Sequence, residues 1–475
     1  MNHTNRSHLY SRRGFLRSVA GAGAVAATGA MLSSCGRLTG SDIAGRDGNS
    51  LVVAILGTSA DAAARETLLA GFREVHPEID VRLQPIQGAD WGDFFAKIMT
   101  QVAAGTPPDV VYVATEGTQL FAEQLVIPLD DLVRRDAVEL GEYFGDVHPS
   151  LVESMMYEGS LYQMPIEFNA ANVYFATSAL EESGLELPPA DWTLDDLNRY
   201  AVAQRASSPR NFVPYYWTNR MWGGVVPFLF ANGTNLLTEE KAPGGQWMWD
   251  SFYQGVPSAA GRGGGYRWEA PQVTDAKVVD TFEFLNDMIA SGASTRPESG
   301  GGEALLGLFS SGNIGMTTAG GFWAGGLADG GMSEDEFDVQ FFPRGESQRQ
   351  QYGAAGYAIM RTTEKRDAAW EFVKYASSRP AMESMMTANQ TTPARRSMVT
   401  AARYAETGPK NWSVFYDSLD RFPDTGPIPS PSQQAAVQNV VLKNVTLALN
   451  SSDAVRPTLS RMQNELEVVL QRKVG

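Results

Sequence analysis

The sequence predicts an α/β protein that is divided into more than one domain. Its 475 residues are more than a single compact core usually holds. Hydrophobic residues make up 43% of the chain and charged residues 19%, as in ordinary globular proteins. Short apolar runs alternate with amphipathic stretches after residue 50, and this order is typical of a parallel, doubly wound sheet.

The charge and the rare residue types exclude several classes of function. A formal net charge of −16 argues against a nucleic-acid partner, which would need a basic face. With Cys35 as the single cysteine, neither a disulfide framework nor a cysteine-ligated metal site is possible. Only four histidines are present, and His76 and His148 each precede a proline in a turn-like stretch. We therefore expect no metal, no cofactor and no histidine-based catalysis.

The first 50 residues carry signals for export. Ser11–Arg17 is similar to the twin-arginine motif, and the weakly apolar Gly21–Leu32 is too short to span a bilayer. Leu32–Cys35 resembles a lipobox, in which a peptidase cuts before a cysteine that carries lipid. These patterns predict a signal over residues 1–35, a polar tether over 36–50 and a lipid anchor at Cys35. The protein would then lie on the extracytoplasmic face of the cell membrane.

The predicted elements of the first part alternate between strands and helices. Gly57 ends the first apolar run, and His76 with Pro77 ends the first helix. In chain order the elements are a strand over Leu51–Leu56, a helix with Leu68, Phe72 and Val75 on one face, a strand over Ile79–Pro85, a helix over Trp91–Val102 and a strand that ends at Val113. In such sheets ligands bind beyond the carboxyl ends of the strands. Glu116, just after the last of them, is a candidate ligand contact or else a solvated helix cap.

The stretch Gly159–Phe175 organises the rest of the chain. Its first part alternates like a strand, and Pro165 marks a strand end or a change of sheet. Glu167 and Asn169 then fall where the backbone is expected to be irregular, before the apolar run resumes at Val173. We interpret this stretch as a crossover between two lobes, with both side chains facing the cleft. The alternative is an ordinary hairpin inside one domain.

Four ordered motifs carry a resemblance to a known family. They are carried by Phe72–Val81, Ala103–Val111, Ile127–Leu132 and Gly159–Pro165. Their order and spacing resemble those of bacterial extracellular solute-binding proteins of family 1, the sugar-binding partners of ABC importers. Later matches lie at Leu187–Leu197 and Glu303–Trp323, whereas residues 232–268 look like an insertion.

The resemblance implies a two-lobed, periplasmic-binding-protein-like fold of type II, with hinged lobes joined by crossover strands. The boundaries it suggests are residues 51–165 and 345–392 for lobe 1, and 166–344 and 393–475 for lobe 2. It also implies a monomer without enzymatic activity that binds a carbohydrate and delivers it to an ABC transporter permease.

Aromatic residues and glycines in the second part supply further candidate ligand contacts. Trp217 and Trp222 sit in a loop-like stretch, where indole rings could stack on pyranose rings or simply pack in a core. By resemblance, Gly321 would let the ligand approach the backbone and Trp323 would stack on it. Arg395 could face the cleft or form a salt bridge to an acidic neighbour.

Two other functions remain open from the sequence. A secreted glycoside hydrolase would need two carboxylates across the scissile bond, and Glu116 with Glu167 could supply them. A binder of a non-sugar solute is the other alternative, and Arg220 and Arg395 leave room for an anionic one.

Overall fold

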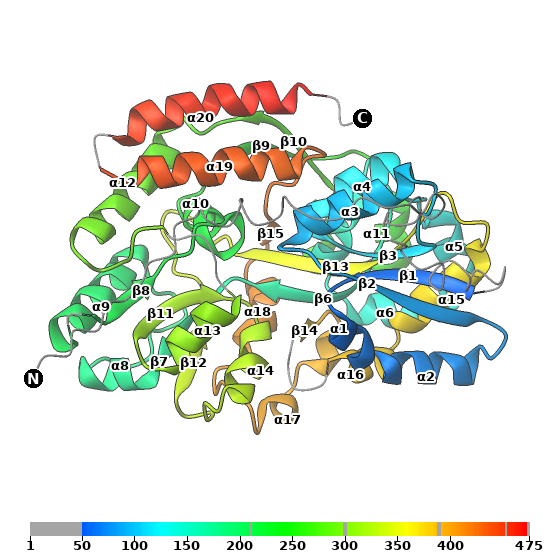
Figure 1. Ribbon diagram of the computed structural model, residues 1–475, viewed down its shortest axis with the longest axis horizontal. Coiled ribbons are helices and arrows are strands. Elements are labelled where there is room, and N and C mark those ends of the chain that lie inside the picture. The colour runs from blue at the N-terminus through cyan, green and yellow to red at the C-terminus, as the bar shows by residue number, and fades with distance from the viewer. Residues whose placement is uncertain (1–49, 210, 298–301, 387–390, 452–453, 473–475) are drawn as a thin grey trace, which may run out of the picture. The chain divides into compact units, whose positions relative to one another are not determined.

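The computed structural model describes residues 50–475 apart from 210, 298–301, 387–390, 452–453 and 473–475. The described chain is organised around two sheets, which lie side by side in Figure 1 with β6 and β13 between their other strands. The signal, Cys35 and the tether up to residue 49 lie outside the described residues, whereas Ser50, the last residue of the predicted tether, is buried and begins the first strand. No helix in the part that is described has both the length and the apolar character needed to cross a bilayer.

The larger sheet has seven strands in the order β14-β6-β13-β3-β1-β2, with β15 paired to β13. The strands are β1 (Ser50–Leu56), β2 (Asp80–Ile86), β3 (Val110–Ala114), β6 (Met164–Ala170), β13 (Gln351–Ile359), β14 (Thr392–Pro393) and β15 (Gly426–Pro427). The predicted parallel order of the first three strands is confirmed, because β1 pairs in parallel with both β2 and β3. The complete sheet is mixed, since β13 inserts antiparallel between β3 and β6.

The smaller sheet has four strands in the order β12-β7-β11-β8. They are β7 (Asn172–Ala176), β8 (Val213–Tyr216), β11 (Ile314–Ala319) and β12 (Phe337–Gln340). Two short pairs complete the strands: β4 (Met156–Tyr157) with β5 (Ser160–Leu161), and β9 (Leu237–Lys241) with β10 (Tyr266–Pro271).

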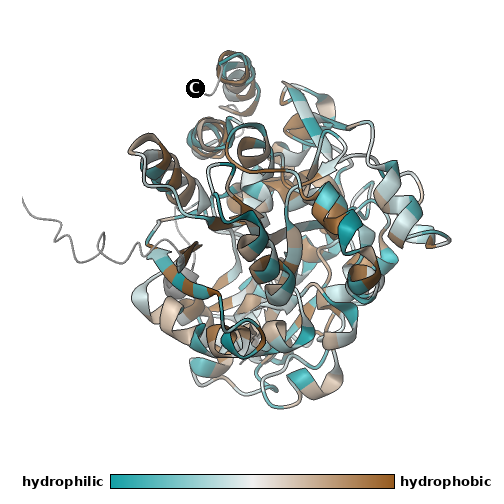
Figure 2. Ribbon diagram, turned by 90° about the vertical axis from the view of Figure 1, so that its right-hand side faces the viewer, coloured by the Kyte–Doolittle hydropathy of each residue, from teal (hydrophilic) through white to brown (hydrophobic). Residues whose placement is uncertain are grey.

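Helices cover both sheets and bury one face each. Helix α2 buries Leu68, Leu69 and Phe72, and single helices in Figure 2 carry both hydrophilic and hydrophobic stretches. The helices before β6 are α1 (Ser59–Ala64), α2 (Glu66–Val75), α3 (Trp91–Ala103), α4 (Thr118–Gln124), α5 (Asp130–Arg135), α6 (Ala137–Asp146) and α7 (Pro149–Ser154). Between β7 and β12 lie α8 (Thr177–Glu182), α9 (Leu194–Ser207), α10 (Val226–Ala231), α11 (Gln246–Phe252), α12 (Ala276–Ala290), α13 (Gly302–Ser310) and α14 (Phe322–Asp329). The rest are α15 (Arg366–Ala376), α16 (Arg379–Met385), α17 (Ala401–Tyr404), α18 (Val414–Arg421), α19 (Gln434–Ala448) and α20 (Val455–Leu470).

The stretch Gly159–Phe175 does join the two sheets. Strand β6 belongs to the larger sheet and β7 to the smaller one, and Ala171 alone separates them. The backbone of Glu167–Asn169 is not irregular as predicted, because it continues strand β6 against β13. The irregularity lies beside Pro165, where the register shifts, as expected for a residue that has no N–H to donate.

Two further features concern the ends of the predicted lobes. A second passage between the sheets runs from β12 to β13 through residues 341–350. Beyond residue 393, strand β15 still pairs with β13, whereas α19 and α20 pack with the apolar cluster around α10 and α12. Residues 50–475 form one compact unit, so the lobe boundaries and the hinge between lobes stay predictions.

The segment over residues 232–268, which the sequence left unplaced, packs against α6 and α7. Phe252 of α11 lies 4.3 Å from Phe144 of α6, measured between ring centroids. The Tyr253 hydroxyl donates to the carbonyl of Val147 over 3.0 Å. The glycines of this segment also permit a close approach to the turn between β4 and β5, since a Cβ on Gly264 would lie 2.4 Å from the Cα of Gly159.

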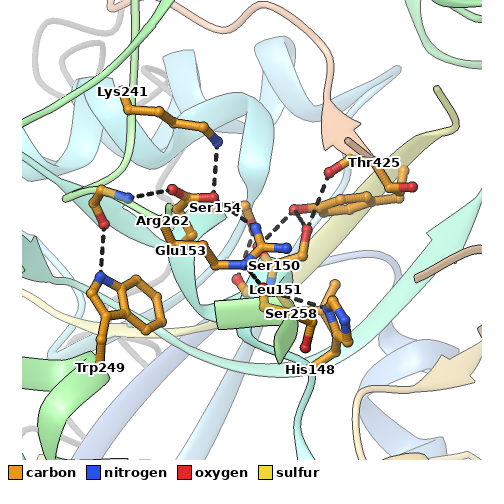
Figure 3. Close-up of polar contacts among 12 residues, drawn as sticks. His148, Ser150, Leu151, Glu153, Ser154, Lys241, Trp249, Ser258, Arg262 and Thr425 are labelled. Carbon is orange, nitrogen blue, oxygen red and sulfur yellow. Dashed lines mark hydrogen bonds and ion pairs between the residues drawn. The ribbon is translucent and has the colours of Figure 1, made fainter. Parts of the chain in front are cut away.

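A buried carboxylate holds this segment to α7 (Figure 3). Glu153 is fully buried and accepts from Lys241 Nζ and Arg262 Nη1, each at 2.8 Å. Its other oxygen accepts from the backbone N–H of Gly263 at 2.7 Å. Two cations and an amide therefore offset the cost of removing this carboxylate from water.

The imidazole of His148 lies at the start of the same helix, where it is held in its neutral form. His148 Nδ1 accepts from the N–H of Ser150 at 3.2 Å, and Nε2 is buried without a partner in the described part of the chain. Burial lowers the pKa of His148 to about 3, and the charge of Arg262 acts in the same direction. A protonated ring could not accept the bond that caps the helix.

Replacing Glu153→Gln should lower the free energy of unfolding by about 3 kcal/mol, because the buried guanidinium of Arg262 loses its counter-charge and Lys241 loses its ion-pair partner. Chemical denaturation at pH 7 measures this loss. The matched control is Glu158→Gln, which removes a half-exposed pair with Arg267 and should cost less than about 1 kcal/mol. Equal losses in the two variants would contradict the assigned role of Glu153.

His148 should make the fold less stable as the pH falls. Below pH 6.5 the unfolded chain binds a proton at His148 that the folded chain excludes until about pH 3. The contribution of His148 to the free energy of unfolding is therefore fully present above pH 6.5. It falls by about 1.4 kcal/mol per pH unit below that, or about 2 kcal/mol by pH 5. Denaturation of the wild type and of His148→Asn at pH 7 and pH 5 measures the difference. If the free energy of unfolding of His148→Asn fell between pH 7 and pH 5 as steeply as that of the wild type, the role assigned to His148 would be contradicted.

Candidate functional site

A cavity of about 770 Å³ lies among elements of both sheets. Its walls come from β6 and β13, from the turns that follow β3, β8 and β11, and from the starts of α3 and α19. The lining residues are Ala89–Gly92, Ala114, Glu116, Glu167–Asn169, Asn219–Trp222, Phe322, Gly353–Ala355, Thr391, Ile428, Gln434, Ala435, Gln438 and Leu442. A cavity of this size and mixed lining suits a small organic ligand.

The turn that carries Trp222 is fixed from the opposite sheet. Backbone φ is positive at Gly223, and its N–H donates to Gln351 Oε1 over 2.8 Å. Trp222 then lies against Gly353 of β13, where a Cβ would come within 2.9 Å of the indole nitrogen. Glycine at this position is what lets the ring approach the strand.

Aromatic rings give the cavity flat apolar surfaces. Trp222 and Phe322 lie 5.9 Å apart between ring centroids at an interplanar angle of 44°. Trp91 lines the wall on the α3 side and stacks on Phe95 at 5.8 Å. Such faces pack well against the C–H faces of a ring-shaped ligand.

Polar groups stand between these rings. Asn169 Nδ2 donates to Thr391 Oγ1 at 2.9 Å, while Asn169 Oδ1 accepts from the N–H of Phe322 at 3.2 Å. Glu116 is half-buried after β3 and accepts from the hydroxyl of Thr115 at 3.2 Å. Burial raises the pKa of Glu116, although its own backbone N–H and Thr115 oppose the rise.

Two residues connect the cavity walls from α3 and α19. Gln438 Nε2 donates to Asp90 Oδ2 at 3.0 Å, and Asp90 also caps α3 by accepting from the N–H of Asp93 at 2.9 Å. Both Asp90 and Gln438 line the cavity. The cavity is therefore bridged by a hydrogen bond between residues almost 350 positions apart in the chain.

The structure brings four of the eight predicted contact residues together. Glu116, Glu167, Asn169 and Trp222 all line the cavity. Their contact with a ligand stays a prediction. Residues 57–59, which follow the carboxyl end of β1, do not line the cavity, and Thr58 caps α1.

Trp217 and Trp323 are placed in the protein core. Trp217 is 1% exposed and its indole N–H donates to the carbonyl of Gly224. Trp323 is 3% exposed and packs edge-on against Tyr174 and Phe309. Neither side chain reaches the cavity, and Phe322 supplies the aromatic face that was expected from Trp323.

Gly321 and Arg395 also have other roles. A Cβ on Gly321 would lie 2.2 Å from Thr392 Oγ1, so the glycine makes room for a neighbouring strand and not for a ligand. Arg395 is 4% exposed and pairs with Glu142 at 3.3 Å and Asp146 at 3.5 Å. The salt-bridge alternative for Arg395 is thus the one that the structure bears out.

Several lining residues were not singled out from the sequence. Trp91 looked like part of a helix face, and Phe322 directly precedes the tryptophan that was chosen. Asp90, Asn219, Gln434 and Gln438 have no sequence signal beyond polarity. No cluster of three or more His, Cys, Asp or Glu side chains suited to a metal occurs in the described part of the chain.

The family of the chain follows from a match over most of its length. Residues 68–410 match the family model described as bacterial extracellular solute-binding protein. The chain belongs to this family. The resemblance seen in the sequence motifs is therefore confirmed, and the family is one of exported, extracytoplasmic proteins that bind solutes.

Curated relatives of the family match only part of their length. A protein of Brucella abortus (strain 2308) named as a binding protein is 24% identical over 190 residues, 37% of this chain and 43% of that protein. An uncharacterized ABC transporter extracellular-binding protein of Pyrococcus horikoshii is 24% identical over 206 residues, 41% of each chain. The chain thus spans less than half the length of the curated relatives it matches.

Solved structures confirm the predicted two-lobed fold over nearly the whole described chain. An ABC substrate-binding protein of Listeria monocytogenes in complex with cycloalternan has a TM-score of 0.70 at 18% identity, covering 89% of this chain and 99% of that one. The sugar-binding protein MalE of Xanthomonas citri also has a TM-score of 0.70, at 16% identity, covering 89% and 97%. The GacH receptor of Streptomyces glaucescens, solved with acarbose, has a TM-score of 0.67 at 18% identity, covering 90% and 99%. At these identities the likeness is one of fold.

Proposed function

We propose that this protein captures a carbohydrate between its two sheets and delivers it to an ABC transporter permease. The observation that carries the proposal is the cavity, in which Trp222, Phe322 and Trp91 alternate with Glu116 and Asn169. Pyranose rings combine apolar C–H faces with hydroxyl groups, so they match a lining of this kind. One structural neighbour is described as a sugar-binding protein, and two others were solved with cycloalternan and with acarbose, which supports the same class of ligand.

Capture would work by closure of the two lobes on the ligand. A ligand that contacts both sheets stabilises the closed arrangement in proportion to the contacts made only there. Two hydrogen bonds within the protein also join elements on opposite walls of the cavity. One runs from Gln438 to Asp90 and the other from Gly223 to Gln351. The permease would then distinguish the closed shape from the open one, and no bond in the ligand would be broken.

The predicted tether and lipid anchor at Cys35 would determine where in the cell the protein binds its ligand. The proposed lipid on Cys35 would hold the protein at the extracytoplasmic face of the membrane, where a permease can receive the ligand. The two acyl chains of a diacylglyceryl-cysteine are enough for stable anchoring. We propose that the protein acts there as a monomer.

A thermal-shift screen of residues 36–475 against mono- and oligosaccharides should find ligands that raise the unfolding midpoint, because they bind the folded state alone. For the best of them, Trp222→Ala should weaken binding by about tenfold or more in calorimetry, since a stacking face is lost. Trp247→Ala is the matched control, because Trp247 lies outside the cavity and hydrogen-bonds Asp130. Equal loss in both variants would contradict the assignment of Trp222.

The same ligand also tests the alternative of a glycoside hydrolase, which Glu116 and Glu167 keep open because both line the cavity. An oligosaccharide incubated with the protein should be recovered at its original length by chromatography. Shorter products that disappear in Glu116→Gln would instead establish hydrolysis.

Replacing Cys35→Ser should release the exported protein from the membrane fraction into the medium, because serine cannot form the thioether to lipid. Ser34→Ala, which keeps the thiol, should remain with the membrane. Immunoblots of the two fractions measure the distribution. Retention of the Cys35→Ser protein on the membrane would contradict a lipid anchor at this residue.

A further inference from the structure

Arg220 carries a charge that nothing in the described part of the chain offsets. It lines the cavity directly before Trp222, and its guanidinium lies 5.5 Å from the centroid of that indole ring. Its Nε is buried without a hydrogen-bond partner, and no carboxylate forms an ion pair with it among the described residues. Burial lowers the pKa of Arg220, which is the response expected of a cation that has lost water without gaining an anion.

Two acidic groups of the cavity, Asp90 and Glu167, differ from Arg220 because they have partners within the protein. Asp90 accepts hydrogen bonds from Gln438 and from the N–H of Asp93. Glu167 lies beside Tyr112 and Arg65. Burial and the charge of Glu167 both raise the pKa of Tyr112. Burial works to lower the pKa of Arg65, but the charge of Glu167 helps to raise it. Each of these carboxylates thus has its own partners within the protein.

Glu116 forms no ion pair with any described residue, but it has another way to lose its charge. Burial already raises the pKa of this carboxyl group. A carboxylate that loses water can take up a proton and become neutral, whereas a guanidinium keeps its charge at any physiological pH. When a ligand expels water from the cavity, Arg220 is therefore the group that must find its counter-charge outside the protein.

We propose that the ligand of this cavity carries a negatively charged group, a carboxylate or a phosphate ester, and that the guanidinium of Arg220 receives it. The proposal rests on the proposed function and narrows its ligand to acidic sugars, such as uronic acids or sugar phosphates. A guanidinium binds both kinds of anion through paired N–H donors. The adjacent faces of Trp222 and Phe322 would hold the ring that carries the anion.

Hydroxyl groups of a neutral sugar could accept the same hydrogen bonds without neutralising the charge. The two possibilities differ in a measurable ratio, namely the affinity for an acidic sugar divided by that for its neutral counterpart. If Arg220 binds hydroxyls, or only packs on Trp222, the ratio stays near one and does not depend on Arg220.

The test measures this ratio by calorimetry on residues 36–475 with matched pairs of probes. The pairs are glucose with glucuronic acid, galactose with galacturonic acid, glucose with glucose 6-phosphate, and glycerol with glycerol 3-phosphate. In at least one pair the acidic member should bind about tenfold tighter or more, as expected for a charge-assisted contact. The first two pairs report a carboxylate and the last two a phosphate.

Variants assign the preference to Arg220. Arg220→Gln should bring the ratio to about one, mainly by loss of the acidic member, whereas Arg220→Lys should keep part of the preference. Arg199→Gln is the control, because Arg199 pairs with Asp196 on an exposed helix face and should leave every affinity unchanged. A preference that survives in Arg220→Gln would overturn the proposal.

The remaining outcomes separate this inference from the function it rests on. Neutral sugars that bind as tightly as their acidic partners, or tighter, overturn the inference and leave carbohydrate capture standing. Binding of glycerol 3-phosphate without binding of any sugar supports the anion contact and overturns carbohydrate capture. Binding of no member of any pair overturns the inference, and carbohydrate capture is then decided by the screen of mono- and oligosaccharides.

Discussion

The geometry of the cavity depends on the hydrogen bonds of Gln351. This fully buried residue starts β13, and its carbonyl accepts from the N–H of Ala171, the single residue between β6 and β7. Its side-chain Oε1 accepts from the N–H of Gly223 in the turn that carries Trp222. One glutamine thus connects the passage between the sheets, the central antiparallel strand and the aromatic wall of the cavity.

The chain's passage through Ala171 also places the polar contacts. With no loop between β6 and β7, the end of β6 faces the start of α14, and Asn169 can bond both Thr391 and the N–H of Phe322. These contacts come from three segments that are far apart in sequence. A ligand that replaced or extended them would touch both sheets at once, which is the condition for coupling occupancy to lobe closure.

Much of the fold was predictable because local patterns and tertiary context agree. The apolar run Leu51–Leu56, the helix ended by His76 and the parallel order of the first strands all follow from periodicity and chain breakers. The antiparallel placement of β13 was not predictable in this way, because pairing with strands as distant in the chain as β3 and β6 leaves no local pattern. The extension of β6 through Asn169 was missed for a similar reason. The polar residues there led to a prediction of irregular backbone, whereas pairing with β13 keeps the backbone extended.

The site was half predictable. Residues of the crossover, Glu167 and Asn169, were found because the chain must pass between sheets there. The choice between Phe322 and Trp323 turned on the first turn of α14, where adjacent side chains diverge by about 100°. Sequence alone favoured the larger ring, whereas the neighbours Tyr174 and Phe309 enclose it in the core. Arg395 was ambiguous from sequence because its acidic partners lie about 250 residues away.

The segment over residues 232–268 has a consequence for anyone who would shorten this protein to a minimal receptor. It cannot be deleted like a surface loop, because the deletion would remove both ion-pair partners of the Glu153 carboxylate and expose the ring of Phe144. A trimmed version would need compensating replacements on α6 and α7, so this segment and the two helices beneath it behave as one structural unit.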